Sequence, residues 1–321
     1  MNSISVGVWT YGMCTDRYVG DGYKDKMLLE ERISHIGKIK GANGIEITYP
    51  GDINEDNYQE YKTLLDKYDL SISGMGVEIV CDKKWATGSF SSPIENIRNE
   101  SIELVKKAMD FAQSIGVAVV SLWFGQDGFD YMFQVNYADA FNNMVECVKE
   151  CAKHNPNIKL GIEYKVSEPR LKCMMNSASK ALSVCLLSGC DNVGVTLDVG
   201  HALNAGENLA EVVSLLITQN RLFHLHLNDN YLIADDDMPI GSVHFLQFLE
   251  MFYWLKKLEY KGWYSLDIYP YRDDPDEAVK ASITFIEKMD ELVERKFSDF
   301  SFQREDATPS KVLSMLFDKI F

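Results

Sequence analysis

The chain has 321 residues, of which 46% are apolar and 25% are charged, and its formal net charge is −16. This length and apolar content suit one large α/β domain with a substantial core. The negative field of such a chain repels nucleic acid and anionic lipid, so both are excluded as partners, whereas neutral substrates and divalent cations are favoured.

The seven cysteines are odd in number and form no Cys-x-x-Cys pair, which argues against a disulfide framework and against a zinc–thiolate site. Free thiols in this number indicate a reducing compartment. The N-terminus shows no basic leader, and no stretch approaches the roughly 20 apolar residues of a membrane span. We therefore expect a cytoplasmic protein that binds no membrane.

Short apolar runs alternate with longer amphipathic stretches along the chain. The predicted strands are Ile4–Thr10, Gly44–Thr48, Leu70–Val77, Ala118–Phe124, Lys159–Tyr164, Val193–Asp198, Leu222–Asn228 and Tyr264–Tyr269. The clearest predicted helices are Lys26–Ile39, Tyr58–Lys67, Ile94–Ile115, Val135–Lys153 and Val243–Leu258. Strict alternation predicts parallel strands joined by crossover helices, and eight units predict closure into a single (β/α)8 TIM barrel over residues 1–296.

An open doubly wound sheet is the alternative fold. It calls for a glycine-rich phosphate turn after the first strand, and Thr10-Tyr11-Gly12-Met13-Cys14 lacks that pattern. Residues 297–321 form a C-terminal extension, a loop over 297–307 and then a helix from Pro309 to Ile320. The apolar stripe of that helix must be covered by its own barrel or by a neighbouring subunit.

Four successive strands carry an acid or a histidine at their C-terminal ends. These residues are Glu163, Asp198, His226 and Asp267. In this fold the active site lies at that face of the barrel, so the four side chains meet at one mouth. Carboxylates gathered there repel one another and lose hydration, and they require a cation. Three carboxylates and one imidazole suit Mn²⁺, Mg²⁺ or Co²⁺. His224 lies deeper on the same face as His226, and we expect it to be a hydrogen-bonded core histidine.

A second set of ligand types follows the first. His201 lies just beyond the sixth strand, and an Asp-Asp-Asp run, residues 235–237, follows the seventh. The run by itself is typical of a solvated acidic turn. On a loop at the barrel mouth it predicts a second cation held by His201, Asp235 and Asp237, because alternate residues face one side.

The sequence blocks that carry these residues resemble a known superfamily. GIEYKVSEPR (161–170), VTLDVGH (195–201), FHLHLNDNYLIADDDMPIGSVHF (223–245) and SLDIYPYRDDP (265–275) resemble the xylose isomerase-like TIM barrels, and LWFGQDGFDY (122–131) is similar to their fourth strand. The His-x-Asn-Asp and Ala-Asp-Asp-Asp pattern is closest to the bacterial L-rhamnose isomerase and related sugar isomerase group.

That resemblance implies one metal on Glu163, Asp198, His226 and Asp267, and a second, catalytic metal on His201, Asp235 and Asp237. Mn²⁺ is the first choice, with Mg²⁺ or Co²⁺ as alternatives. The resemblance also implies that Lys165, Glu163 and Asp267 are catalytic residues. In this role Lys165 hydrogen-bonds the substrate carbonyl oxygen and stabilises the negative charge that develops there. Pairing of Lys165 with Glu168 is the alternative. The family and the C-terminal stripe together imply a dimer or tetramer.

The chain departs from the family in one respect. Sugar isomerases of this type carry a ring-opening histidine in the first half of the barrel, but here the only histidine before residue 150 is His35, inside a predicted helix. Ring opening therefore needs Asp127, Glu78 or a metal-bound water, unless the substrate opens by itself.

Five further residues are candidates for binding the sugar. Glu46 ends the second strand and either bonds a hydroxyl or forms an internal salt bridge. Trp9, Trp123 and Phe124 either wall the pocket or belong to the core. Trp85 is a candidate lid residue of this subunit or of a neighbour.

The first hypothesis for function is a metal-dependent aldose–ketose isomerase that moves hydride between C1 and C2 of an unphosphorylated sugar. A keto-sugar 3-epimerase is the main alternative, although it uses two opposed glutamates and the eighth strand here carries the shorter Asp267. An inosose dehydratase-like lyase and a catalytically silent sugar-binding barrel are the remaining alternatives.

Overall fold

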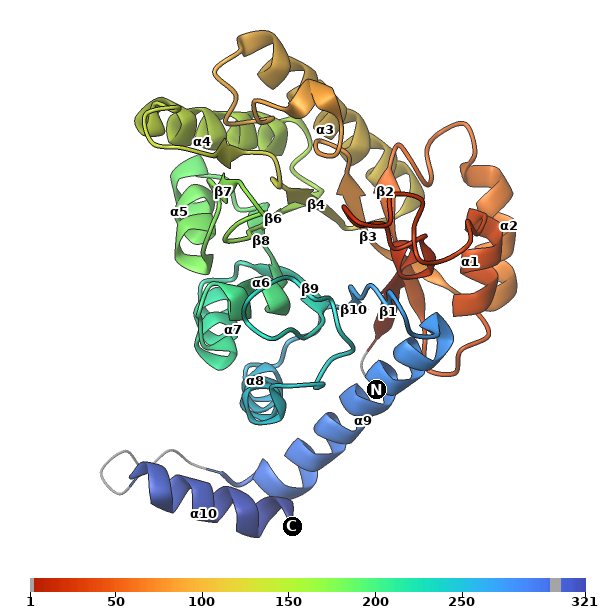
Figure 1. The fold of residues 1–321 in the computed structure, drawn as a ribbon, viewed down its shortest axis with the longest axis vertical. Coiled ribbons are helices and arrows are strands. Elements are labelled where there is room, and N and C mark those ends of the chain that lie inside the picture. The colour runs from red at the N-terminus through yellow and green to blue at the C-terminus, as the bar shows by residue number, and fades with distance from the viewer. Residues whose placement is uncertain (1–2, 301–306) are drawn as a thin grey trace.

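The computed structural model describes residues 3–300 and 307–321. Its centre is a closed ring of parallel strands in the order β1-β10-β9-β8-β6-β4-β3-β2 (Figure 1). These strands are β1 (Ile4–Gly7), β2 (Gly44–Tyr49), β3 (Ser71–Val77), β4 (Val119–Trp123), β6 (Lys159–Glu163), β8 (Val193–Asp198), β9 (Leu222–Leu227) and β10 (Tyr264–Leu266). The predicted (β/α)8 barrel is confirmed.

Helices surround the ring of strands on its outer side (Figure 1). They are α1 (Leu29–Ile36), α2 (Tyr58–Tyr68), α3 (Glu95–Ile115), α4 (Tyr137–His154), α5 (Ala178–Ser188), α6 (Val199–Asn204), α7 (Leu209–Thr218), α8 (Phe245–Lys257) and α9 (Pro275–Phe297). Short 3-10 turns, η1 (Val8–Tyr11) and η2 (Lys83–Trp85), lie in the loops after β1 and β3. A two-stranded antiparallel pair, β5 (Gly128–Phe129) with β7 (Lys172–Cys173), ties two loops together at the barrel mouth.

The first and the last strand are shortened the most relative to the prediction. The first ends at Gly7, because the next residues turn and the Gly12 amide donates to the Trp9 carbonyl at 2.7 Å. The last ends at Leu266, after which the Tyr269 amide donates to the Asp237 carbonyl at 2.9 Å. Both strands therefore pass into loops that lie over the barrel mouth.

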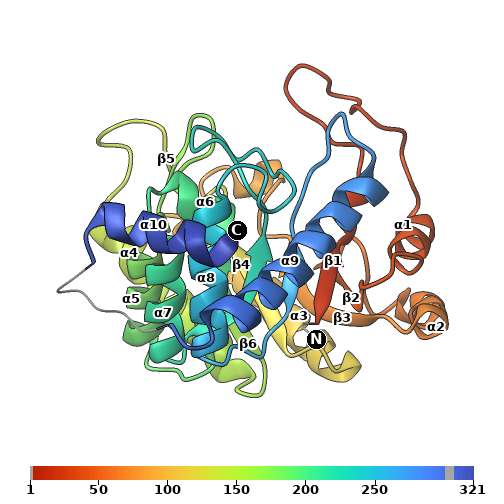
Figure 2. The ribbon, with the colours of Figure 1, turned by 90° about the horizontal axis from the view of Figure 1, so that it is seen from below.

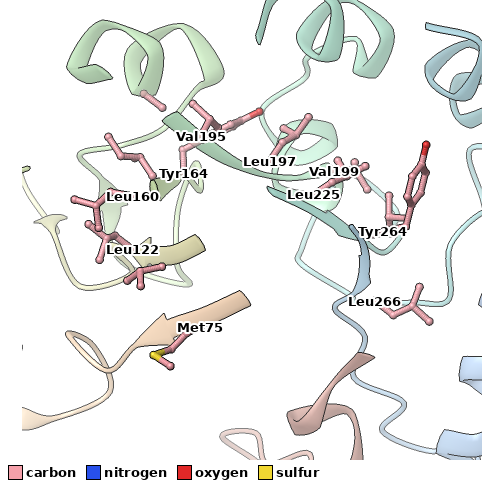
Figure 3. Close-up of a cluster of buried hydrophobic side chains, with 14 of the residues drawn as sticks. Met75, Leu122, Leu160, Tyr164, Val195, Leu197, Val199, Leu225, Tyr264 and Leu266 are labelled. Carbon is pink, nitrogen blue, oxygen red and sulfur yellow. The ribbon is translucent and has the colours of Figure 1, made fainter. Parts of the chain in front are cut away.

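Alternation along each strand separates an apolar outer face from a polar interior. Leu160, Val195, Leu197 and Leu225 are fully buried and point away from the centre of the ring, toward the helices (Figure 3). The residues between them point inward, because successive side chains of a strand face opposite sides. Polar side chains consequently meet inside this barrel and continue to its C-terminal mouth.

The C-terminal extension contains the predicted helix, α10 (Pro309–Ile320), which packs against α9 (Figure 2). Residues 301–306 of the predicted loop lie outside the described residues. Leu313 and Phe317 of the apolar stripe remain 43% and 50% exposed, so a partner subunit stays a prediction. Within residues 3–300 and 307–321, every helix is too short or too polar to cross a membrane.

Candidate metal and sugar site

A cavity of about 740 Å³ opens at the C-terminal mouth of the barrel. Its walls come from the ends of the barrel strands and from the loops that follow them. The residues predicted for the site that line it are Trp9, Glu46, Trp85, Trp123, Glu163, Lys165, His201, His226, Asp235, Asp237 and Asp267. Two predicted residues, Asp198 and Phe124, do not line the cavity, and both are buried.

The first predicted ligand group is assembled by four neighbouring strand ends. Ligand atoms of Glu163, Asp198, His226 and Asp267 all lie within 4.8 Å of one another. The Nδ1 atom of His226 faces the three carboxylates, at 3.7 Å from Glu163, 3.9 Å from Asp198 and 3.3 Å from Asp267. This arrangement is the oxygen-rich, one-imidazole set expected for a hard divalent cation.

Unpartnered buried atoms test whether a metal fits this group. Among the described residues, the Nδ1 atoms of His226 and His201 and the Oδ1 atom of Asp235 are buried without a hydrogen-bond partner. Buried polar atoms in proteins are normally satisfied, and such orphans indicate an ion or water at the site. The unpartnered Nδ1 atom of His226 therefore fits a divalent cation bound by this group.

Electrostatics lead to the same conclusion. Burial raises the pKa of Asp198 to about 7, with nearby carboxylates adding to the effect and His201 opposing it. Burial and the negative charge of Asp235 raise the pKa of Asp237 well above its usual range. Carboxylates with such pKa values are held in a field that favours a proton or a cation.

A second ligand group adjoins the first, but its members differ from the predicted set. Asp198, His201 and Asp235 bring ligand atoms within 4.8 Å of one another, and Nε2 of His201 lies 3.1 Å from Asp235. Asp237 lines the cavity but stands outside this group within the described part of the chain. Its backbone has φ +46°, so the extended alternation that was to align it with Asp235 does not exist here.

Lys165 lies between the second group and a loop carboxylate. Its Nζ is 2.9 Å from Asp235 and 2.6 Å from Glu168, and 5.3 Å from the ring centre of Trp123. Burial alone would lower the pKa of Lys165, but the charges of Asp235 and Glu168 outweigh burial and raise it above its ordinary value. Lys165 therefore stays an ammonium group at the cavity wall, and the alternative pairing with Glu168 is present as well.

The aromatic predictions divide between wall and core. Trp9 donates from Nε1 to Asp267 at 2.6 Å and holds that carboxylate in place. Trp85 is fully buried in the cavity wall, with Nε1 donating to the Glu78 carbonyl at 3.2 Å. Phe124 corrects the prediction, because it is 2% exposed and packs on Phe90 in the core. Phe124 follows Trp123, the last residue of β4, and therefore faces the side opposite to Trp123.

Glu46 also differs from the prediction of a sugar-binding residue. It is 1% exposed and accepts hydrogen bonds from Nε2 of His224 and from Nε2 of His226, both at 2.9 Å. Burial would raise its pKa, but the two imidazoles lower it well below its usual value. The internal salt bridge is thus present, and His224 is the buried, hydrogen-bonded core histidine that the sequence predicted.

The two side chains proposed for ring opening are separated by the structure. Glu78 lines the cavity and accepts a hydrogen bond from the Thr48 hydroxyl at 2.9 Å. Asp127 is fully buried outside the cavity wall, where its carboxylate accepts from the Ser89 and Ser91 amides and from the Ser89 hydroxyl. Asp127 therefore holds the loop that carries Trp85 and does not reach a substrate.

We expect Asp127→Asn to lower the free energy of unfolding by about 1–3 kcal/mol, because the new amide group would face a donor in a dry site. Urea denaturation followed by tryptophan fluorescence measures this loss. Asp130→Asn, a change at an exposed residue of the loop that contains Asp127, serves as the control. A stability equal to that of the wild type would show that the buried carboxylate does not hold the loop.

Sequence reasoning missed several residues of the site. Asn228 donates from Nδ2 to Asp198 at 2.8 Å and orients it, and Thr48 and Tyr271 line the cavity. The signal for Asn228 was available, because it lies two residues after His226 and shares its face of the chain. Tyr271 gave no such signal, since its place depends on the path of a loop.

The fold and site together define a (β/α)8 barrel with an acid-rich mouth whose side chains fit a divalent cation. A family model described as "Xylose isomerase-like TIM barrel" matches residues 37–289, and the chain belongs to that family. The xylose isomerase of Thermus thermophilus is 20% identical over 289 residues, 86% of this chain and 74% of the relative.

Solved structures with the same fold include sugar epimerases. An L-ribulose 3-epimerase superimposes with a TM-score of 0.72 and 16% identity, covering 95% of this chain and 99% of that one. The D-allulose 3-epimerase from Methylomonas sp. gives a TM-score of 0.69 and 18% identity, with coverage of 90% and 97%. The likeness shows that the fold is shared, and the finer resemblance to the L-rhamnose isomerase group stays a prediction.

Proposed function

We propose that this protein is a divalent-metal-dependent aldose–ketose isomerase that acts on an unphosphorylated sugar. One observation carries the proposal: the Asp198–His201–Asp235 group adjoins the first ligand group, and Lys165 lies against its Asp235. Two adjacent cation sites beside a fixed ammonium group suit a reaction that needs two neighbouring sugar oxygens held and one of them polarised.

The charge of the cavity supports a substrate without phosphate. Among the described lining residues, the lysine and arginine side chains are Lys84 and Lys165. Lys84 is already paired with Glu100 at 2.6 Å, and Lys165 is paired with two carboxylates. A phosphate group would meet acids without a free cationic partner, so a neutral polyol is the favoured ligand.

The reaction moves a hydride from C2 to C1 of the aldose while a proton passes from O2 to O1. Bound divalent cations supply Lewis-acid polarisation of the sugar oxygens. Glu163, Asp198, His226 and Asp267 would hold one such cation, and Asp198, His201 and Asp235 would hold the other. Lys165 donates a hydrogen bond to the carbonyl oxygen, where negative charge develops. Trp9 and Trp123 wall the site, and Glu78 is placed in the cavity to take the ring hydroxyl proton.

A ketose 3-epimerase is the second candidate, and the comparisons with solved structures favour it. The neighbours reported above are named for 3-epimerisation of ketoses and span at least 90% of this chain. Glu163 and Asp267 both line the cavity as an acid–base pair would. Against it, Oδ1 of Asp267 is engaged by Trp9, and Lys165 with the second ligand group has no assigned part in that chemistry.

One experiment separates the two reactions. Metal-stripped protein, with and without added Mn²⁺, is incubated in D₂O with a panel of aldoses and ketoses, and the products are followed by NMR. We expect Mn²⁺-dependent interconversion of an aldose and its ketose without solvent deuterium on carbon. Epimerised ketose with deuterium at C3 would establish the second candidate. Mn²⁺ binding without turnover of any sugar would contradict both.

A further inference from the structure

A buried hydrogen-bond network lies directly behind the first ligand group. Glu46 of β2 accepts three hydrogen bonds inside the barrel, from His226 to Oε1 and from His224 and Ser265 to Oε2. The His224 and His226 bonds are 2.9 Å long and the Ser265 bond is 2.6 Å. A carboxylate only accepts hydrogen bonds, so each imidazole must present an Nε2–H to it.

This donation determines which nitrogen of His226 remains for a ligand. With the proton on Nε2, the lone pair of a neutral imidazole is on Nδ1. Nδ1 is the atom that faces Glu163, Asp198 and Asp267, and it is buried without a hydrogen-bond partner among the described residues. In the neutral imidazole, the network therefore presents a lone pair to the group of carboxylates, as a cation bound there requires.

We propose that Glu46 is the positioning residue of the metal centre, which fixes the Nε2–H tautomer and the ring orientation of His226 so that Nδ1 binds the cation. This inference rests on the metal site of the proposed function, and it assigns to Glu46 a task distinct from sugar binding. A carboxylate behind a metal-binding histidine orients the ring and raises the basicity of the ligand.

The packing around Glu46 supports this role. Gly74 of β3 faces the network, and a β-carbon there would lie 3.2 Å from Nε2 of His224 and 3.3 Å from Oε1 of Glu46. The space is thus filled by the carboxylate and the imidazoles. Glu46, His224 and His226 also bring ligand atoms within 4.8 Å of one another, but their nitrogen and oxygen atoms are in hydrogen-bond contact at 2.9 Å, so we assign them to a hydrogen-bond network.

Glu46→Gln tests the proposal, with Ser265→Ala as the matched control. The glutamine is neutral and has one acceptor oxygen, so it cannot accept from both imidazoles and no longer raises the basicity of His226 as the carboxylate does. We expect the Kd for Mn²⁺, measured by calorimetry, to rise about 10–100-fold in Glu46→Gln. Ser265→Ala keeps both imidazole contacts, and its Kd is expected to equal that of the wild type.

A spectroscopic measurement covers the case in which Glu46→Gln does not fold. In the Mg²⁺-loaded wild type, ¹⁵N NMR of the imidazoles is expected to show Nε2–H tautomers for His224 and His226. An Nδ1–H tautomer for His226, or an unchanged Mn²⁺ affinity in a folded Glu46→Gln protein, would overturn the proposal. Mn²⁺ binding by the wild type without sugar turnover would instead contradict the proposed function alone.

Discussion

Asp198→Asn is expected to weaken Mn²⁺ binding at least ~100-fold, more than the loss of an outer hydrogen-bond partner costs, and to abolish metal-dependent turnover. Asp198 is the residue that the two ligand groups share, so both lose a negative ligand at once. Its carboxylate is 1% exposed and already oriented, by the His201 amide on Oδ1 and by Asn228 on Oδ2. The asparagine keeps the volume but loses the charge.

The fold of this variant is expected to survive, because Asn228 can turn its amide so that its unpartnered Oδ1 accepts a hydrogen bond from the new amide group. Burial is the main cause that raises the pKa of Asp198 to about 7, and its acidic neighbours add to the effect, so the neutral amide removes both a buried charge and that repulsion. Thermal denaturation with chelator should therefore give a melting temperature no lower than that of the wild type, while the stabilisation by added Mn²⁺ disappears. Asp191→Asn, a change at a fully exposed carboxylate, is the control. Normal Mn²⁺ affinity in Asp198→Asn would refute the shared-ligand assignment.

Lys165→Met is expected to lower kcat by about 10²–10³-fold, the cost of removing one donor from a developing oxyanion. Mn²⁺ affinity should change much less, because Lys165 is not a ligand. The neighbouring acids raise the pKa of Lys165 above its ordinary value, so raising the pH through the neutral range should not mimic the variant. Single-substrate kinetics on the sugar identified by NMR measures the effect.

The same substitution should also destabilise the protein, because it leaves Asp235 and Glu168 without their cation. Breaking a buried ion pair costs about 3–5 kcal/mol, and the partial exposure of Glu168, 29%, places the expected loss at the lower end. Lys172→Met, at an exposed lysine of the same loop region, is the control. An unaltered kcat in a folded Lys165→Met protein would remove Lys165 from the proposed mechanism.

The barrel and the first ligand group could be predicted from sequence because both depend on local periodicity. Strand and helix alternate along the chain, and residues of one parity on a strand face the barrel interior. Glu163, Asp198 and His226 have that parity at the ends of their strands, and the ring closes them into one group. No long-range information was needed to choose them.

The tertiary structure decided the residues whose role depends on a partner distant in sequence or on a loop path. In the sequence, Glu46 is simply an acid near the end of a strand. Only the closed barrel brings its side chain to His224 and His226 of β9 and to Ser265 of β10. Asp237 lies two residues after Asp235, so an extended chain would turn both side chains to the same side. The left-handed φ of Asp237 removes that extended conformation. The sequence places Asp127 just after a strand, as if it lined the barrel mouth. In the structure its loop buries the carboxylate against the amides of Ser89 and Ser91.

The physical reason for this division is the range of the interactions involved. Strand parity and helix periodicity follow from bonds between near neighbours, which the sequence alone determines. A buried carboxylate accepts hydrogen bonds from donors that only the folded chain brings close to it. The backbone conformation of a loop residue likewise depends on the contacts that fix the two ends of the loop. The sequence by itself therefore determined the barrel and which strand ends carry ligands, whereas the tertiary structure decided which acids face a cation and which hold the ligands in place.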